Sequence, residues 1–327
     1  MHQKRNVILG LRKVDWSDLE RQNEFLNCVI SAMGHFGKKY TYDELACISG
    51  CAFRACSPKQ GVNPGAYHII EDMSIIEHTF KMLGYNATLH TPSDYETDRK
   101  LIMDSIDRGV PVLTFQGVIS CSECCIISGY DDDGAVLLGW NPFMYGSGYA
   151  HDEPADSTGY FRKSKWHDGD LKQVAARILI IGEPTTTLSK EETIRETLRW
   201  AVKLIRAGQA GHTHYAELIC KDNDDWFCLD LMMVCLGCNV YQDKLYVAPF
   251  LREAKTVIKD KADVLEECAK LYDQIAVYRH EMNKYLPEAE AQTGERVKDK
   301  ELRKQYAQRV LKIRDLEKQA ADLLEKI

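Results

Sequence analysis

Long hydrophobic runs are missing from this chain of 327 residues, and no stretch approaches the ~18 consecutive apolar residues that a membrane-spanning helix requires. Basic residues are also in the minority, with 42 Lys and Arg against 49 Asp and Glu. Because affinity for nucleic acid comes mainly from clustered Lys and Arg, a formal charge of -7 argues against nucleic acid as a principal partner. We therefore expect neither a membrane protein nor a nucleic-acid-binding protein.

Several short signatures are absent as well. No phosphate-binding loop, dinucleotide-binding glycine pattern or HExxH motif occurs, so we expect no cofactor. The apolar stretch at 7–11 is too short for an export signal, and we expect a cytoplasmic protein. Thiols stay reduced in that compartment, so the 12 cysteines are expected to be buried, metal-binding or nucleophilic rather than paired in disulfides.

The composition that remains is that of an ordinary globular protein, with 45% hydrophobic and 28% charged residues. Up to about residue 185 the sequence mixes short strand-like and helical segments with many Gly and Pro residues, whereas helical periodicity dominates afterwards. We therefore predict an α+β domain with a small antiparallel sheet over 1–185. A helical domain is predicted over 186–327.

The elements expected in the first domain are short. Helices are predicted over 28–36, from Thr41 onward and over 72–83, and strands over 110–115, 124–130, 135–140 and 176–181. The Asp-rich segment 131–134 joins two of these strands and is expected to be a solvated turn rather than a cation site. This pattern is typical of an antiparallel sheet flanked by helices.

The second domain is expected to consist of long helices. One is predicted to begin after Ser189 and to end at Gly208, and another to run over 252–286. A last helix carries an apolar seam at nearly heptad spacing, formed by Leu302, Tyr306, Val310, Ile313, Leu316, Ala320, Leu323 and Ile327. The last two helices would form an antiparallel hairpin, and their seam would serve packing or the assembly of a homo-oligomer.

Cys28 is the first candidate for chemistry. It is predicted to stand at the start of an amphipathic helix, where the helix dipole favours a thiolate. Gln22 lies six residues upstream, a spacing at which a side-chain amide can face an oxyanion beside the sulfur. The alternative is an inert structural thiol, because free cysteines are among the most buried residues.

Four short blocks of sequence carry a resemblance to a known family: Gln22 to Cys28, Pro111-Val112, CCIISGYD at 124–131 and GWNP at 139–142. Together they resemble the papain-like cysteine peptidase superfamily. The likeness is strongest to the bacteriocin-processing (double-glycine) peptidase-like group and to the N-terminal domain of the butirosin-biosynthesis acyltransferase. The segments 48–54 and 159–163 resemble a group of uncharacterised bacterial proteins related to these. The resemblance covers 22–183 and implies a papain-like fold there.

The resemblance also implies roles for individual residues. Cys28 falls on the nucleophile, Gln22 on the oxyanion donor and Asn141 on the residue that orients the catalytic His. The position of that His, seven residues before Tyr130, is occupied by Glu123. A carboxylate beside a thiol disfavours the thiolate and is a poor base for it, so a Cys/Glu pair would be a weak nucleophile.

Other polar groups complete the candidate site. His68 follows the Gly- and Pro-rich loop at 57–67 and is expected to line a substrate cleft. Two CxxC pairs, Cys121/Cys124 and Cys235/Cys238, could be read as zinc ligands. The first pair leads into a strand, where residues three apart point to opposite faces, and the second lies in an apolar segment. We therefore expect no metal site.

Two functions from different classes remain. The first is a cysteine-dependent acyl-transfer enzyme, namely a peptidase, amidase or acyltransferase that acts on a small molecule or peptide. Its catalytic residues would be Cys28, Gln22, Asn141 and, as the base, Glu123 or a His from elsewhere in the chain. The alternative is a catalytically degenerate papain-like protein that binds a small molecule or peptide without covalent chemistry, because Glu123 replaces the expected His.

Overall fold

The computed structural model describes residues 4–14, 17–18, 20–55, 73–115, 124–141, 155–167, 177–221, 241–285 and 295–327. The chain divides into two compact units. The first, the sheet unit, comprises 1–42 and 83–186, and the second, the helical unit, comprises 43–82 and 187–327. The segment 43–82 thus groups with the C-terminal helices, although it lies within the first half of the sequence.

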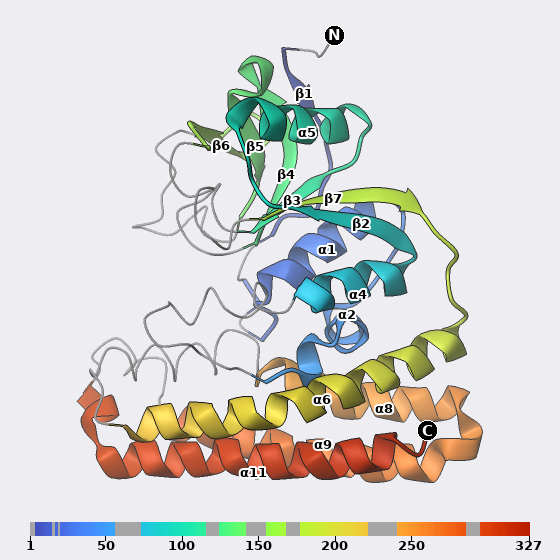
Figure 1. Ribbon diagram of the computed structural model, residues 1–327, viewed down its shortest axis with the longest axis vertical. Helices are drawn as coiled ribbons and strands as arrows, with labels where there is room; N and C mark the ends of the chain where they lie inside the picture. Colours follow the sequence, from blue (N-terminus) through green and yellow to red (C-terminus); the bar gives the residue numbers. More distant parts are fainter. Residues whose placement is uncertain are drawn as a thin grey trace. The chain divides into compact units, whose positions relative to one another are not determined.

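The sheet unit is built on seven strands (Figure 1). Their order is β2-β7-β3-β4-β5-β6, β1 also pairs with β4, and every pair of neighbours is antiparallel. The strands are β1 (Asn6–Val7), β2 (Tyr85–His90), β3 (Val112–Phe115), β4 (Cys124–Asp131), β5 (Val136–Trp140), β6 (Phe161–Ser164) and β7 (Arg177–Pro184). The expected combination of an antiparallel sheet with helices is therefore confirmed.

One helix covers each face of the central strands. β3 and β5 are buried throughout, as is β4 up to Tyr130, so both of their faces need cover. On one face, Phe25 of α1 (Glu24–His35) packs against Phe115 of β3, with ring centroids 5.9 Å apart. On the other, Tyr130, which follows the irregularity of β4 between Ile127 and Gly129, donates its hydroxyl proton to Asp107 of α5 (Tyr95–Asp107) at 2.6 Å. The sheet therefore separates α1 from α5.

The turn between β4 and β5 follows the sequence expectation. Asp132 and Asp133 adopt left-handed backbone conformations, with φ of 49° and 52°, inside the short 3-10 helix η3 (Asp132–Gly134). Asp tolerates this conformation better than most residues, since its short side chain can bond to the local backbone. Gly139 of β5 has a different reason to be glycine, because a Cβ there would lie 2.1 Å from the Ile126 carbonyl oxygen of β4.

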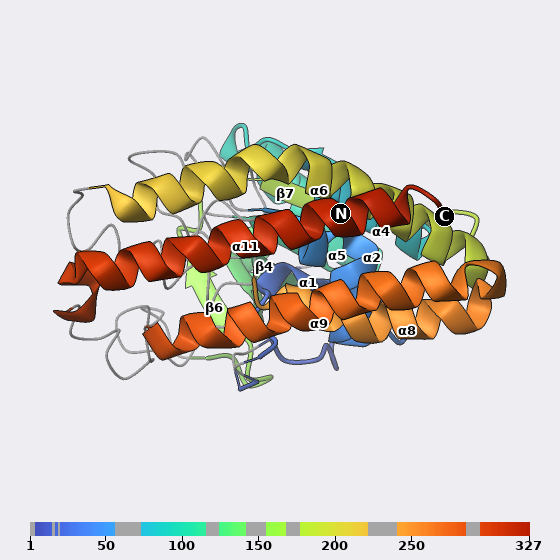
Figure 2. The same ribbon diagram turned by 90° about the horizontal axis from the view of Figure 1, so that it is seen from below.

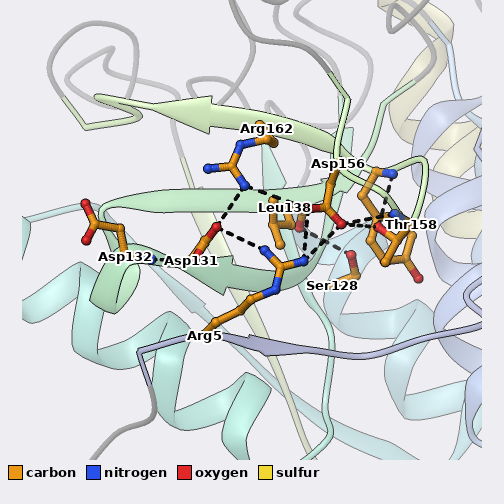
Figure 3. Close-up of polar contacts among 9 residues, drawn as sticks. Arg5, Ser128, Asp131, Asp132, Leu138, Asp156, Thr158 and Arg162 are labelled. Carbon is orange, nitrogen blue, oxygen red and sulfur yellow. Dashed lines mark hydrogen bonds and ion pairs between the residues drawn. The ribbon is translucent and has the colours of Figure 1, made fainter.

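An ion-pair network fastens the first strand and the 155–162 segment to this turn (Figure 3). The Arg5 guanidinium donates to Asp131 at 3.0 Å and to Asp156 at 2.9 Å, while Arg162 donates to Asp131 at 2.8 Å. The hydrogen bond from Arg162 is the main reason that the pKa of Asp131 lies below its usual value. Each of the two arginines pairs with an aspartate and each aspartate with an arginine, so we interpret this network as structural.

The helical unit contains long, nearly parallel and antiparallel helices (Figure 2). Helix α11 lies between α6 and α9 and packs against both of them. The α-helices of the helical unit are α2 (Tyr42–Ser49), α4 (Met73–Leu83), α6 (Lys190–Cys220), α8 (Val247–Val257), α9 (Ala262–Tyr285) and α11 (Lys300–Leu324). Its short 3-10 helices are η1 (Cys51–Phe53), η6 (Asp243–Tyr246), η7 (Lys259–Lys261) and η8 (Glu295–Lys298). None of the described helices is both long and apolar enough to cross a membrane.

Two helix boundaries differ from the sequence expectation. Gly208 does not end its helix, and α6 continues to Cys220. A Cβ at Gly208 would lie 2.7 Å from the Ala55 Cβ, so glycine is needed there for close packing rather than as a stop signal. The helix predicted over 252–286 is instead two helices, because Ile258 leaves the helical conformation (φ -97°, ψ 72°) and α8 folds back on α9.

The apolar seam of α11 is buried within this chain, but its course differs from the predicted one. Tyr306, Val310 and Ile313 are fully buried, as expected. The next buried position is Glu317 rather than Leu316, and the seam then continues through Ala320 and Leu324. Spacings of four and three residues are kept throughout, so a carboxylate occupies a regular seam position.

Candidate functional site

Cys28 lies one turn inside its helix rather than at its start. Helix α1 begins at Glu24, and the side chain of the N-cap residue Asn23 accepts a hydrogen bond from the Leu26 amide at 3.2 Å. The helix predicted to begin at Cys28 therefore begins four residues earlier. Because the dipole effect is confined to the first turn, the favourable field expected for a thiolate at Cys28 is reduced.

The Cys28 thiol is fully buried against strand β4. Its exposed fraction is 0%, and its Sγ donates to the Cys124 carbonyl oxygen at 3.6 Å. The Cys124 thiol in turn donates to the Cys125 carbonyl oxygen at 3.9 Å. Burial, and then the neighbouring Cys28 thiol, raise the pKa of Cys124 well above the ordinary thiol value. The two sulfurs thus form a buried thiol pair in which Cys124 stays protonated.

Asn141 contacts a different cysteine of the same strand. Its Nδ2 donates to the Cys125 Sγ at 2.8 Å, and its side chain is fully buried. Successive residues of a strand point to opposite faces. Cys124 pairs across the sheet with Phe115, which faces α1, so Cys125 and the Asn141 amide face the other side. Cys28 and Asn141 therefore meet neighbouring residues of β4 from opposite faces of the sheet.

The remaining predicted site residues are less informative. Gln22 is partly buried and immediately precedes the N-cap residue of α1. Glu123 and His68 lie outside the described residues, as do Cys121, Cys235 and Cys238. In the described part of the chain, no three His, Cys, Asp or Glu residues are grouped as metal ligands would be.

Two described histidines of the sheet unit, His35 and His167, form polar contacts with groups other than Cys28. His35 contacts the Gly109 carbonyl oxygen at 2.8 Å. His167 is buried and lies 2.9 Å from Asp98 of α5, on the face of the sheet opposite to Cys28. Asp98 also accepts from the Ser93 amide at 2.8 Å, so this His–Asp pair is tied to the start of α5. Neither histidine is placed as a base for the thiol.

A second polar cluster, not expected from the sequence, lies inside the helical unit. Lys244 of η6 and Glu317 of α11 are both 0% exposed and form an ion pair at 2.5 Å. The other oxygen of Glu317 lies 2.8 Å from the His212 Nε2, and the His212 Nδ1 lies 2.7 Å from the Tyr241 hydroxyl. The Tyr272 hydroxyl donates to Glu317 at 3.5 Å. We refer to these five residues as the buried polar network.

The charges of this network follow from its burial. Burial lowers the pKa of His212 and of Lys244, although Glu317 opposes both shifts. Burial by itself would raise the pKa of Glu317, but Lys244 and His212 outweigh it and hold that pKa below its usual value. A neutral His212 with its proton on Nε2 can donate to Glu317 and accept from Tyr241, which satisfies both of its nitrogens. Lys244 and Glu317 are then the charged pair.

Sequence reasoning missed this network for a physical reason. His212 was recognisable only as half of a His-x-His pair, a possible metal motif lacking a third ligand. Lys244 belongs to no periodic pattern, and Leu316 fits an apolar seam as well as the neighbouring Glu317 position does. Only the packing of α6, α11 and η6 brings the three together.

Comparison with known proteins does not assign the chain to a family. No family model matches it, and no curated protein shows significant similarity to it. Inferences about function therefore rest on the resemblance of short motifs and on the geometry described above.

Proposed function

We propose that the sheet unit is a catalytically degenerate relative of the papain-like cysteine acyl-transfer enzymes, which binds a small molecule or peptide without covalent chemistry. The observation that carries the proposal is the state of the Cys28 thiol. Its Sγ is 0% exposed and its proton is directed at the Cys124 carbonyl oxygen. A nucleophilic cysteine needs access to substrate and a group that favours the thiolate.

The surroundings of the thiol support the same conclusion. Burial and the neighbouring Cys28 thiol raise the pKa of Cys124 well above the ordinary thiol value, and a protonated thiol supplies neither a positive charge nor a base. Asn141, which would orient a catalytic His in the papain-like pattern, donates to Cys125 on the other face of the sheet. Binding without covalent chemistry is the role that the resemblance implies for such a site.

Thiol alkylation tests this proposal. Native protein is treated with iodoacetamide at neutral pH, and the modification of each cysteine-containing peptide is followed by mass spectrometry. Cys220 is exposed and serves as the reference for an accessible thiol. Cys268, whose pKa is raised to about 12 by burial, is the reference for an inert one. We expect Cys28 to react like Cys268, at least about tenfold more slowly than Cys220. A Cys28 that reacts faster than Cys220 would contradict the proposal.

A cysteine acyl-transfer enzyme is the second candidate, and one observation favours it. Helix α1 packs against β4, so that Cys28 bonds to Cys124, the residue that directly follows Glu123. In the family pattern the base stands directly before Cys124 in the sequence. In this case the Glu123→His variant should speed the alkylation of Cys28 and extend it to lower pH, since imidazole is a suitable base near neutrality. An unchanged rate would show that Glu123 does not lie beside the thiol, as the family pattern requires.

A further inference from the structure

Arg54 is a buried cation without a hydrogen-bond acceptor. Arg54 belongs to the helical unit and directly follows η1 in the sequence. Only 6% of the residue is exposed. Its Nε, Nη1 and Nη2 atoms are all buried, and none of them has an acceptor among the described residues. A guanidinium carries five N–H donors and stays protonated in proteins. Burying it unpaired is costly, because both its charge and its donors lose water.

The backbone around Arg54 is held firmly, so the side chain is not placed by a loose loop. The Lys244 ammonium donates to the Arg54 carbonyl oxygen at 2.9 Å and approaches that of Ala52 at 3.4 Å. Ala55 packs so closely on α6 that Gly208 cannot carry a side chain without a clash. Arg54 is therefore fixed between η6 and α6.

Among the described residues, Glu317 and Asp243 do not pair with the Arg54 guanidinium. Glu317 already accepts from Lys244 and lies within hydrogen-bond distance of His212. Asp243 is fully buried and acts electrostatically on Lys244 and on the Cys47 thiol, but it gives Arg54 no hydrogen bond. The Arg54 and Lys244 cations thus lie close enough to interact electrostatically, and neither of these two carboxylates accepts a hydrogen bond from Arg54.

We propose that Arg54 binds an oxyanion, namely a carboxylate or phosphate group of a small ligand, inside the helical unit. The planar guanidinium matches two oxygens of such a group at once, which is why arginine is favoured at these sites. The nearby Lys244 adds positive charge to the site, although its own hydrogen bonds go to Glu317 and to backbone carbonyl oxygens. This site is independent of the function proposed for the sheet unit.

Ligand-dependent stability and direct titration test the site in the full-length protein. The probes are inorganic phosphate and acetate, each compared with sodium chloride at equal ionic strength. Binding to the folded state raises the unfolding midpoint with the logarithm of ligand concentration, and calorimetric titration measures the affinity. We expect at least one oxyanion to stabilise the wild-type protein beyond the chloride control. The two probes distinguish a carboxylate site from a phosphate site.

Substitutions assign the effect to Arg54. Arg54→Met should abolish the oxyanion effect, and Arg54→Lys, which keeps the charge but loses the planar fork, should weaken binding by about tenfold or more. Arg206→Met is the matched control, because it removes an equal charge from a surface guanidinium already bonded to Asp322 and Glu325. It should leave the effect unchanged.

Two results would overturn the proposal. One is a wild-type protein whose stability responds to phosphate and acetate no more than to chloride. The other is an oxyanion effect that persists at full strength in Arg54→Met or, should that variant not fold, in Arg54→Lys. In either case the buried guanidinium would not be a ligand site.

Discussion

Replacing Glu317 by Leu tests whether the buried polar network is a linked unit of the helical bundle. The carboxylate is 0% exposed and accepts from Lys244 at 2.5 Å, with His212 at 2.8 Å from its other oxygen. The substitution suits the apolar seam of α11 but leaves the Lys244 ammonium buried without its counter-charge. Breaking a buried pair in this way costs about 3–5 kcal/mol. We expect a loss of that size in the free energy of unfolding.

The double variant Glu317→Leu/Lys244→Met separates the charge effect from packing. Removing both charges eliminates the unpaired cation, so the double variant should recover about 2 kcal/mol relative to Glu317→Leu. Recovery should be incomplete, because the His212 N–H still lacks its acceptor, at a cost of about 1–3 kcal/mol. Glu325→Gln is the control: it weakens an exposed pair with Arg206, which is worth less than about 1 kcal/mol.

Urea unfolding followed by far-ultraviolet circular dichroism measures these differences, since the helical unit contributes most of the helical signal. A Glu317→Leu variant within about 1 kcal/mol of wild type would show that Glu317 and Lys244 are not a linked buried pair, because breaking such a pair costs about 3–5 kcal/mol. A double variant less stable than Glu317→Leu alone would contradict this pairing too.

Three further predictions concern other parts of the molecule. Burial, reinforced by Lys81, lowers the pKa of His78 from 6.5 to about 4, and its ring stacks on Trp200 with centroids 4.6 Å apart. The unfolded chain therefore binds more protons between these pH values, so stability should fall by about 1–2 kcal/mol as pH drops through this window, after allowance for solvent screening. His78→Phe should flatten that pH dependence, and an unchanged slope would speak against the assignment. In the ion-pair network of Figure 3, Asp131→Asn should destabilise the sheet unit by about 1–2 kcal/mol, because it weakens bonds to both Arg5 and Arg162. Asp104→Asn, at a surface pair with Lys100, should cost below about 0.5 kcal/mol, and equal losses in urea unfolding would contradict this. Gly139→Ala should cost about 3 kcal/mol or more, since its Cβ would meet the Ile126 backbone oxygen at 2.1 Å. Gly34→Ala, with open space around its Cβ in α1, should stabilise by about 0.5–1 kcal/mol, and thermal unfolding of the two variants compares them.

Local signals were sufficient for much of the sheet unit. The runs at 124–130 and 135–140 lie within or close to β4 and β5, and the Asp-rich segment between them is a tight turn with left-handed residues. These features depend on neighbouring residues, which the sequence displays directly. The strand order, the pairing of β1 with β4 and the grouping of 43–82 with the C-terminal helices depend on contacts between distant segments.

The errors in the helical unit have the same physical origin. Gly208 resembles a helix stop, but its role is set by Ala55, which lies far away in the sequence. The break at Ile258 carries neither Gly nor Pro, so no local signal marks it. Glu317 was not expected in the seam, because a buried carboxylate is stable only where Lys244 and His212 meet it.

In the candidate site, too, features set by neighbouring residues could be predicted, whereas contacts between distant segments could not. The sequence pointed to Cys28 and to strand 124–130, and the two are in contact through Cys124. The start of α1 at Glu24 was missed, although Asn23 is a favourable N-cap residue. The pairing of Asn141 with Cys125 depends on the register of β4 with β5, which no motif encodes.

Whether Cys28 can form an acyl-enzyme decides most directly between a degenerate and an active site. The protein is incubated with an activated thioester, the reaction is quenched in acid, and acyl adducts are located by peptide mass spectrometry. A Cys28→Ser variant is run in parallel, with the exposed Cys220 as the internal reference. We expect no adduct on Cys28, while Cys220 is acylated at the slow rate of an ordinary surface thiol. Acylation of Cys28 ahead of Cys220 would contradict this expectation and identify the sheet unit as an active acyl-transfer enzyme.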